Sequence, residues 1–249
     1  MPRPRFATVS ATAALSLSAA CASRPAATEE PETATQLDVS AHETRLEASE
    51  AEGTLSLPVI AGGRPGVADR INAALAPEAL LGAPLEAVVS RYAACACGTV
   101  GASFTVTLQR AGLLAVRVSV ESLSAYPTVH AAGFAFDAAT GASLMRDDIF
   151  AAASQGALVA MLNDRLRVAA TAEAERARQD GEGEIAERLS QEAFTAEDLT
   201  TFSLTATGID FLWEADLPHV ALAYGPDAPS LTWSEAAPFL TPRLAPLVR

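Results

Sequence analysis

The stretch FTVTLQRAGLLAVRVSVE, residues 104–121 of the 249-residue chain, decides the fold. On both sides of its centre, apolar residues alternate with polar or small ones, the pattern of a strand with one buried face. The alternating apolar positions are Phe104, Val106 and Leu108 before the centre and Leu114, Val116, Val118 and Val120 after it. Because Arg110-Ala111-Gly112 between them contains a glycine suited to a tight turn, the stretch predicts a β-hairpin.

Further strands are expected on the C-terminal side of this hairpin. Phe134 and Phe136 alternate on a third strand, which ends in a turn at residues 137–141. A second hairpin is predicted around Thr207-Gly208, because apolar residues alternate through residues 202–206 and again through 209–213. A last strand is expected over residues 220–224.

Helical spacing separates these groups of strands. Val67, Ile71 and Leu75 recur every four residues and so share one stripe of a helix, and a second helix is expected over residues 84–94. Helical spacing returns between residues 149 and 194. Groups of strands with helices between them predict an α+β fold, with antiparallel sheet meanders packed against intervening helices.

Residues 1–20 have the pattern of an export signal peptide. Arg3 and Arg5 precede an uncharged stretch rich in Ala, Ser and Leu, which is too short and too weakly apolar for a stable membrane span. The stretch ends in LSAAC at residues 17–21, which resembles a bacterial lipobox with its Leu one residue farther from the Cys than usual. We therefore expect Cys21 to carry a lipid that anchors an exported protein in the bacterial cell envelope, at the periplasmic or outer-membrane face. Ordinary cleavage, giving a freely secreted protein, is the alternative.

The remaining chain is expected to have three parts, and composition marks the first of them. Residues 21–53 are acidic, rich in Pro, Ala, Thr and Glu, and poor in large apolar residues, so a disordered tether is predicted there. Residues 54–125 are expected to form a helix–hairpin module, and residues 126–249 a second module. The membrane would then be reached through the N-terminal lipid only.

The chain is strongly acidic, with 30 Asp and Glu against 17 Lys and Arg and a formal net charge of −13. This charge argues against a nucleic-acid partner, because such proteins use basic residues to neutralise phosphates. It favours a cationic partner, which the field of the protein would draw from solution. We therefore expect a binding protein that meets a basic ligand and no nucleic acid.

The chemistry-bearing residues form no recognisable catalytic pattern. His42, His130 and His219 are the only histidines, and neither a G-x-S-x-G elbow nor an H-x-x-x-H spacing occurs. We expect a non-enzymatic protein with no catalytic residues, no metal site and no cofactor. A hydrolase or deacetylase acting on envelope polysaccharide, or an accessory to one, is the alternative function.

Cys95-Ala96-Cys97 is the one unusual motif. If Cys21 is lipidated, these are the only remaining thiols, and an exported protein meets an oxidising compartment. A disulfide between Cys95 and Cys97 is therefore possible. It could act as a structural staple or have a redox role, and a soft-metal site with Met145 or Met161 is a further alternative.

Several spaced stretches resemble the RsiV C-terminal-like extracytoplasmic domain, which is found in RsiV-type anti-sigma factors and beside the deacetylase domain of PdaC-type peptidoglycan deacetylases. These stretches are YPTVH (126–130), FAFDAATGASL (134–144), DIF (148–150), FSLTATGIDF (202–211) and WSE (233–235). Residues 57–72 are similar to the small module that usually precedes that domain. The resemblance covers residues 54–245 and assigns residues 126–249 to this domain. The sequence departs from the family at Thr128-Val129, where a Gly-Ala pair usually precedes the His.

The resemblance implies a cell-envelope binding or sensing module, which in the anti-sigma members recognises lysozyme. The expected partners are therefore a cationic lysozyme-like protein or peptidoglycan. No family contact residue can be matched to this sequence. We expect the ligand to contact loops at the sheet edge that carry Tyr126, His130 and Tyr224, and a buried hydrogen-bonded corner is the alternative role for these three residues.

Overall fold

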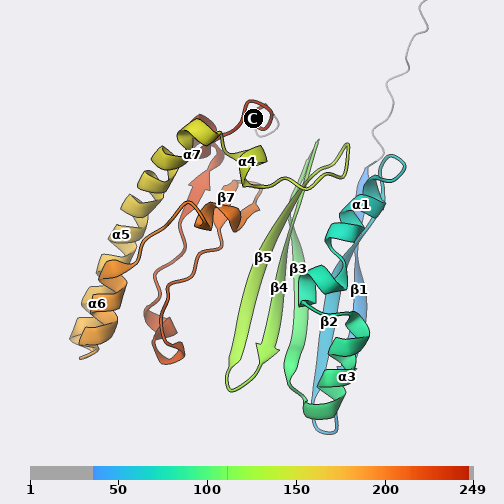
Figure 1. Ribbon diagram of the computed structural model, residues 1–249, viewed down its shortest axis with the longest axis horizontal. Helices are drawn as coiled ribbons and strands as arrows, with labels where there is room; N and C mark the ends of the chain where they lie inside the picture. Colours follow the sequence, from blue (N-terminus) through green and yellow to red (C-terminus); the bar gives the residue numbers. More distant parts are fainter. Residues whose placement is uncertain (1–35, 111, 247–249) are drawn as a thin grey trace, which may run out of the picture. The chain divides into compact units, whose positions relative to one another are not determined.

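The structure is a computed structural model that describes residues 36–110 and 112–246 (Figure 1). It contains a five-stranded sheet in the order β1-β2-β3-β4-β5 and a three-stranded sheet in the order β6-β7-β8. The strands are β1 (Leu37–Glu47), β2 (Glu52–Gly62), β3 (Gly98–Arg110), β4 (Leu113–Leu123), β5 (Pro127–Asp137), β6 (Phe202–Leu204), β7 (Gly208–Phe211) and β8 (Ser230–Thr232).

Helices connect β2 to β3 and fill most of the chain between β5 and β6. The α-helices are α1 (Val67–Ala74), α2 (Pro77–Leu81), α3 (Leu85–Cys95), α4 (Arg146–Ile149), α5 (Gln155–Gln179), α6 (Gly183–Gln191) and α7 (Trp233–Ala236). The 3-10 helices are η1 (Ala152–Ser154), η2 (Asp198–Thr200), η3 (His219–Tyr224) and η4 (Ala237–Phe239). The predicted α+β fold class is therefore confirmed.

The expected hairpin is formed by β3 and β4, and the expected third strand is β5. These strands pair antiparallel over most of their length, while β2 meets β3 in a short parallel ladder at Thr54 and Leu55. The expectation of one buried face fails for β4, whose residues 113–116 are buried without interruption. The reason is that the sheet is covered on both sides.

One face of the sheet packs against the helices that follow β2. Val116 and Val118 on β4 share a buried cluster with Val67 and Ile71 on α1. A neighbouring cluster joins Leu55 and Leu57 on β2 to Val88 and Tyr92 on α3. Residues 67–95 as a whole are apolar and long enough to cross a membrane. The structure divides them among α1, α2 and α3, which contribute to these two clusters.

The other face of the sheet packs against the C-terminal elements. Leu113 and Ala115 on β4 share a buried cluster with Leu158 and Leu162 on α5 and with Phe211 on β7. Helices α5 and α7 lie on this side of β5 and helices α1 and α3 on the opposite side (Figure 1). The sheet is therefore the middle layer of this part of the chain.

Strand β6 reaches β5 at Gly133, where the two backbones approach closely. A Cβ atom added at Gly133 would lie 1.8 Å from the carbonyl oxygen of Phe202. An Arg117–Asp210 ion pair of 2.9 Å and a bond from the Ser203 hydroxyl to Thr107 join the same layers. Glycine is therefore required at position 133 by the contact between the two layers.

The expected tether is wrong for residues 37–53. Residues 37–47 form β1, which pairs antiparallel with β2 along its whole length, and Leu37 and Leu46 are buried. An edge strand needs few apolar side chains, because backbone hydrogen bonds and the neighbouring strand supply its stability. The low apolar content of this segment therefore does not make it disordered.

The expected division between residues 125 and 126 is also wrong. It falls in the turn between β4 and β5, whose residues pair from Leu123–Pro127 to Leu113–Asp137. The described residues belong to one compact unit. Two modules cannot be separated there, because the cut would divide the central sheet.

The second predicted hairpin is confirmed as β6 and β7, but the last strand is in the wrong place. Residues 219–224 form the 3-10 helix η3, and residues 230–232 form the third strand instead. Pro218 and Gly225 flank η3, so the alternating residues 220, 222 and 224 lie on a short helix bounded by chain-breaking residues. Helix α2 was not predicted at all.

The Gly133 contact predicts a large destabilisation on adding a single methyl group. Gly133→Ala should lower the free energy of unfolding by about 2 kcal/mol or more, because the new atom overlaps the Phe202 backbone. Gly156→Ala in α5 is the matched control, since nothing lies within 4 Å of its added Cβ. Urea unfolding of the two variants measures the difference. Equal stability of both variants would contradict the close contact.

Glu235 predicts a specific dependence of stability on pH. The backbone N–H of Thr232, the guanidinium of Arg165 and the Thr232 hydroxyl hydrogen-bond its carboxylate and lower its pKa from 4.5 to about 2. The ionised form therefore stabilises the fold above the unfolded-state pKa, and this stabilisation is lost as pH falls from 4.5 to about 2. Glu235→Gln should lower the unfolding temperature at neutral pH, and the difference from the unmodified protein should shrink toward pH 2. Glu187→Gln on α6 serves as the charge-matched control, and a constant Glu235→Gln difference at all pH values would contradict this prediction.

Candidate functional site

A groove of about 350 Å3 lies between the start of β5 and the segment that contains η3. Its wall on the sheet side consists of Pro127, Thr128, Val129 and His130. The opposite wall consists of Trp213, Glu214, Ala215, Leu217, Leu222, Gly225 and Pro226. The two walls are therefore more than 80 residues apart in the sequence, and only the tertiary fold brings them together.

Large apolar side chains are exposed around this groove. Among the described residues, eight large hydrophobic side chains are exposed, and five of them lie on its walls or beside them. These five, which we call the apolar rim, are Leu123, Tyr126, Val129, Val220 and Leu222. Val220 is 85% exposed and Val129 58%. A cluster of this kind marks an interaction surface more often than a scattered exposed residue does.

The groove is flanked by acidic residues. Glu214 lines it and is exposed, and Glu121 is the register partner of Val129, so their side chains share one face of the sheet. Asp216 and Asp227 are exposed neighbours of lining residues. No Arg lines the groove, and Arg117 on the same sheet face is paired with Asp210. The local charge is therefore negative and suits a cationic ligand.

A partly buried carboxyl lies behind the acidic wall. Glu192 accepts a hydrogen bond of 3.0 Å from the backbone N–H of Asp216. Burial raises the pKa of Glu192, and the nearby charge of Asp216 raises it further, while the hydrogen bond acts in the opposite direction. The contact fixes residue 216 and so holds the η3 side of the groove in place.

Two of the three residues expected at the ligand surface are brought to the groove. His130 lines it, and Tyr126 lies at the tip of the β4–β5 turn. The Tyr126 ring stacks on the His219 ring with centroids 4.6 Å apart, so the turn contacts the first residue of η3. Tyr126 remains 55% exposed and can contact a ligand as well.

Tyr224 faces away from the groove and serves a structural purpose. Its hydroxyl donates a 2.9 Å hydrogen bond to Asp180, and the Arg176 guanidinium lies 5.1 Å from its ring centroid. The bond to Asp180 raises the pKa of Tyr224. Arg176 also donates to the carbonyl of Ala223, so Tyr224 ties the end of η3 to the C-terminal end of α5.

The remaining predicted residues lie elsewhere. The structure joins Cys95 and Cys97, at the end of α3, by a disulfide, and Ala96 between them has a positive φ of 51°. Cys21 lies outside the described residues. Within the described part of the chain, no group of three or more His, Cys, Asp or Glu side chains could hold a metal ion.

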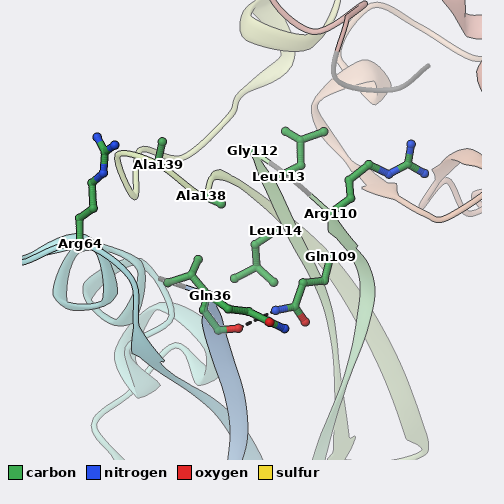
Figure 2. Close-up of a pocket in the computed structure, with 10 residues that line it drawn as sticks. Gln36, Arg64, Gln109, Arg110, Gly112, Leu113, Leu114, Ala138 and Ala139 are labelled. Carbon is green, nitrogen blue, oxygen red and sulfur yellow. Dashed lines mark hydrogen bonds between the residues drawn. The ribbon is translucent and has the colours of Figure 1, made fainter. Parts of the chain in front are cut away.

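A second hollow of about 390 Å3 lies at the other end of the sheet and is a weaker candidate (Figure 2). Gln109 crosses it and donates a 2.6 Å hydrogen bond to the carbonyl of Leu37. The side chains of Arg64 and Arg110 point away from each other in Figure 2, and Arg110 donates to the carbonyl of Ala206. The polar groups that meet in this hollow, the Gln109 amide and the Leu37 carbonyl, are bonded to each other, so it provides no recognisable site.

The described residues form an α+β protein with an acidic groove beside β5. The fold is the one seen in two solved structures. A DUF3298 family protein from Pseudomonas aeruginosa PAO1 has a TM-score of 0.53 at 13% identity and covers 84% of this chain and 96% of its own. A DUF3298 family member from Bacteroides fragilis NCTC 9343 has a TM-score of 0.53 at 17% identity and covers 87% and 98%. No family model and no curated protein matches the sequence.

Sequence reasoning missed most of the groove. Trp213 and Leu222 were expected on strands, where their apolar character indicated a buried sheet face. The available signal was the pair Pro218 and Gly225, because chain-breaking residues on both sides of 219–224 argue against the strand expected there. The approach of residues 213–226 to β5 has no signature in the sequence.

Tyr224→Phe should lower the stability of the protein but leave its affinity for a ligand in the groove almost unchanged. Loss of the bond to Asp180 should lower the unfolding temperature, because that bond holds η3 to α5. The affinity for a ligand in the groove should change less than about twofold, within the range of surface changes away from a contact. Thermal unfolding and a binding titration measure the two effects. A large loss of affinity with unchanged stability would contradict this role.

Proposed function

We propose that this chain is an exported cell-envelope protein that binds a cationic protein of the lysozyme type in the groove beside β5. The signal-like residues 1–20 and the lipobox-like Cys21 support export and lipid anchoring. The likeness to RsiV-type domains supports a binding or sensing role. Peptidoglycan is the alternative ligand.

One observation carries the proposal: two residues of the apolar rim, Val129 and Leu222, line a groove that also contains the exposed Glu214, and the other three rim residues are close in sequence to its lining. Exposed apolar side chains supply the affinity of a protein interface, and complementary charge raises the association rate and selects the partner. A folded basic protein offers both kinds of contact. A carbohydrate chain would make less use of the exposed Val220 and Leu222.

Binding of a basic lysozyme to the mature chain, residues 21–249, tests the proposal. We expect association that weakens about tenfold or more between about 0.03 M and 0.3 M NaCl, because surface charge pairs are screened over this range. Titration calorimetry at the two salt concentrations measures the change. No binding at low salt would overturn the proposal.

Variants locate the surface in the same experiment. Tyr126→Ala and Leu222→Ala should each weaken binding about fivefold or more, because both side chains belong to the apolar rim. Val168→Ala on α5 is the matched control, since Val168 is 74% exposed and lies outside the rim. Glu214→Gln should reduce the salt dependence, whereas Glu187→Gln on α6 should not. Equal effects of rim and control variants would place the surface elsewhere.

A further inference from the structure

The edge of β5 is covered along its second half and uncovered along its first half. The N–H of Leu144 donates to the carbonyl of Ala135, and the N–H of Asp137 donates to the carbonyl of Ala142. Residues 142–144 therefore pair with the end of β5 from outside the sheet. Strand β6 contacts the face of β5 at Gly133, in the direction of the missing Cβ, and does not pair with its edge. On the β5 side of the five-stranded sheet, residues 127–133 are therefore left as a free edge without a paired neighbour among the described residues, and β1 forms the opposite edge (Figure 1).

The hydrogen bonds that residues 142–144 form with β5 also show which backbone groups of the free edge point outward. The outward groups at the covered end belong to residues 135 and 137. The β4–β5 register has no shift from Leu123–Pro127 to Leu113–Asp137, so outward groups alternate regularly. Val129 and Ala131 therefore direct their N–H and C=O groups away from β4. Within the described residues no hydrogen bond reaches these four groups.

The two sides of this free edge differ in chemistry. On one side lies a hollow of about 260 Å3, whose lining includes Leu80, Leu81, Val118 and Phe134 and no Asp, Glu or Arg. On the other side lies the groove with Glu214 in its wall and Glu121 beside Val129. His130 lines both hollows, so they meet at this edge.

We propose that the free edge of β5 at residues 128–132 takes up an extended segment of the partner as an added strand, and that this segment alternates apolar and cationic residues. Successive side chains of a strand point to opposite faces. The apolar ones would enter the hollow by α2, and the cationic ones would face Glu214 in the groove. The unpaired N–H and C=O groups of Val129 and Ala131 supply the hydrogen bonds of the new ladder. This inference rests on the proposed function and specifies how the same surface recognises its ligand.

A synthetic peptide tests the added strand directly. The probe is an acetylated, amidated and fluorescently labelled peptide of sequence Arg-Val-Arg-Val-Arg-Val-Arg, titrated with the mature chain by anisotropy. Two further peptides carry N-methyl groups on every Val or on every internal Arg. Because the N–H groups of alternate residues point to opposite edges of a strand, only one of the two methylated peptides should bind about tenfold or more weakly. Equal affinities of all three peptides, or no binding of the unmodified one, would overturn the proposal.

Ala131→Pro provides the complementary change in the protein. It removes an outward N–H at a free edge, where proline is tolerated, so the fold should persist and circular dichroism checks this. Peptide affinity should fall about tenfold or more, whereas Ala131→Val, which keeps the N–H, should bind nearly as the unmodified chain does. Peptide binding that survives Ala131→Pro would overturn strand addition.

The same variants distinguish this inference from the proposed function. If lysozyme binds with the expected salt dependence but equally well to Ala131→Pro and unmodified chains, the groove docks its partner without an added strand, and this inference fails alone. If the peptide binds as expected but no lysozyme binds, the proposed partner is wrong and the strand site stands. A dimer in analytical ultracentrifugation that Ala131→Pro dissociates would show that a second copy occupies the edge, which overturns the inference.

Discussion

Gly133 and Phe202 meet where β6 comes against β5, and the arrangement of the remaining elements depends on this backbone contact. The missing side chain at residue 133 lets β6 approach until an added Cβ would overlap the Phe202 carbonyl. The C-terminal elements can then bury Leu113 and Ala115 on one face of β4, while α1 buries Val116 and Val118 on the other. The sheet becomes the middle layer, so the burial of apolar surface on both of its faces stabilises one common unit.

The edge of β5 is paired along only part of its length. Beyond Gly133, residues 142–144 complete the edge of β5, and before it nothing in the described chain pairs with Val129 or Ala131. The segment from Trp213 to Pro226 returns near this open end but leaves a groove. The Tyr126 ring stacks on His219 and so connects the β4–β5 turn to η3. The hydrogen bond from Tyr224 to Asp180 holds the end of η3 against the end of α5. An uncovered strand edge can pair with a strand of another chain. In this protein, acidic side chains lie near that edge.

The sequence-level expectations succeeded where local periodicity and the buried pattern agree. The β3–β4 hairpin, β5, the β6–β7 hairpin, α1 and α3 were all indicated by apolar spacing, because each element has at least one buried stripe. They failed where long-range contacts decide the structure. Strand β1 has few apolar residues and is held by its ladder to β2, so its composition suggested disorder. Residues 220–224 alternate like a strand, yet Pro218 and Gly225 bound a 3-10 helix there.

The sequence by itself determined the α+β class, the hairpins and the acidic character. These features depend on neighbouring residues or on summed charge, which a linear sequence contains in full. Only the tertiary structure decided that β5 is open along one half and closed along the other, that Trp213 and Leu222 face it, and that Tyr224 turns toward α5. The position of Trp213 and Leu222 beside β5 and the bond from Tyr224 to Asp180 depend on contacts between segments more than 40 residues apart, and no local pattern encodes such contacts.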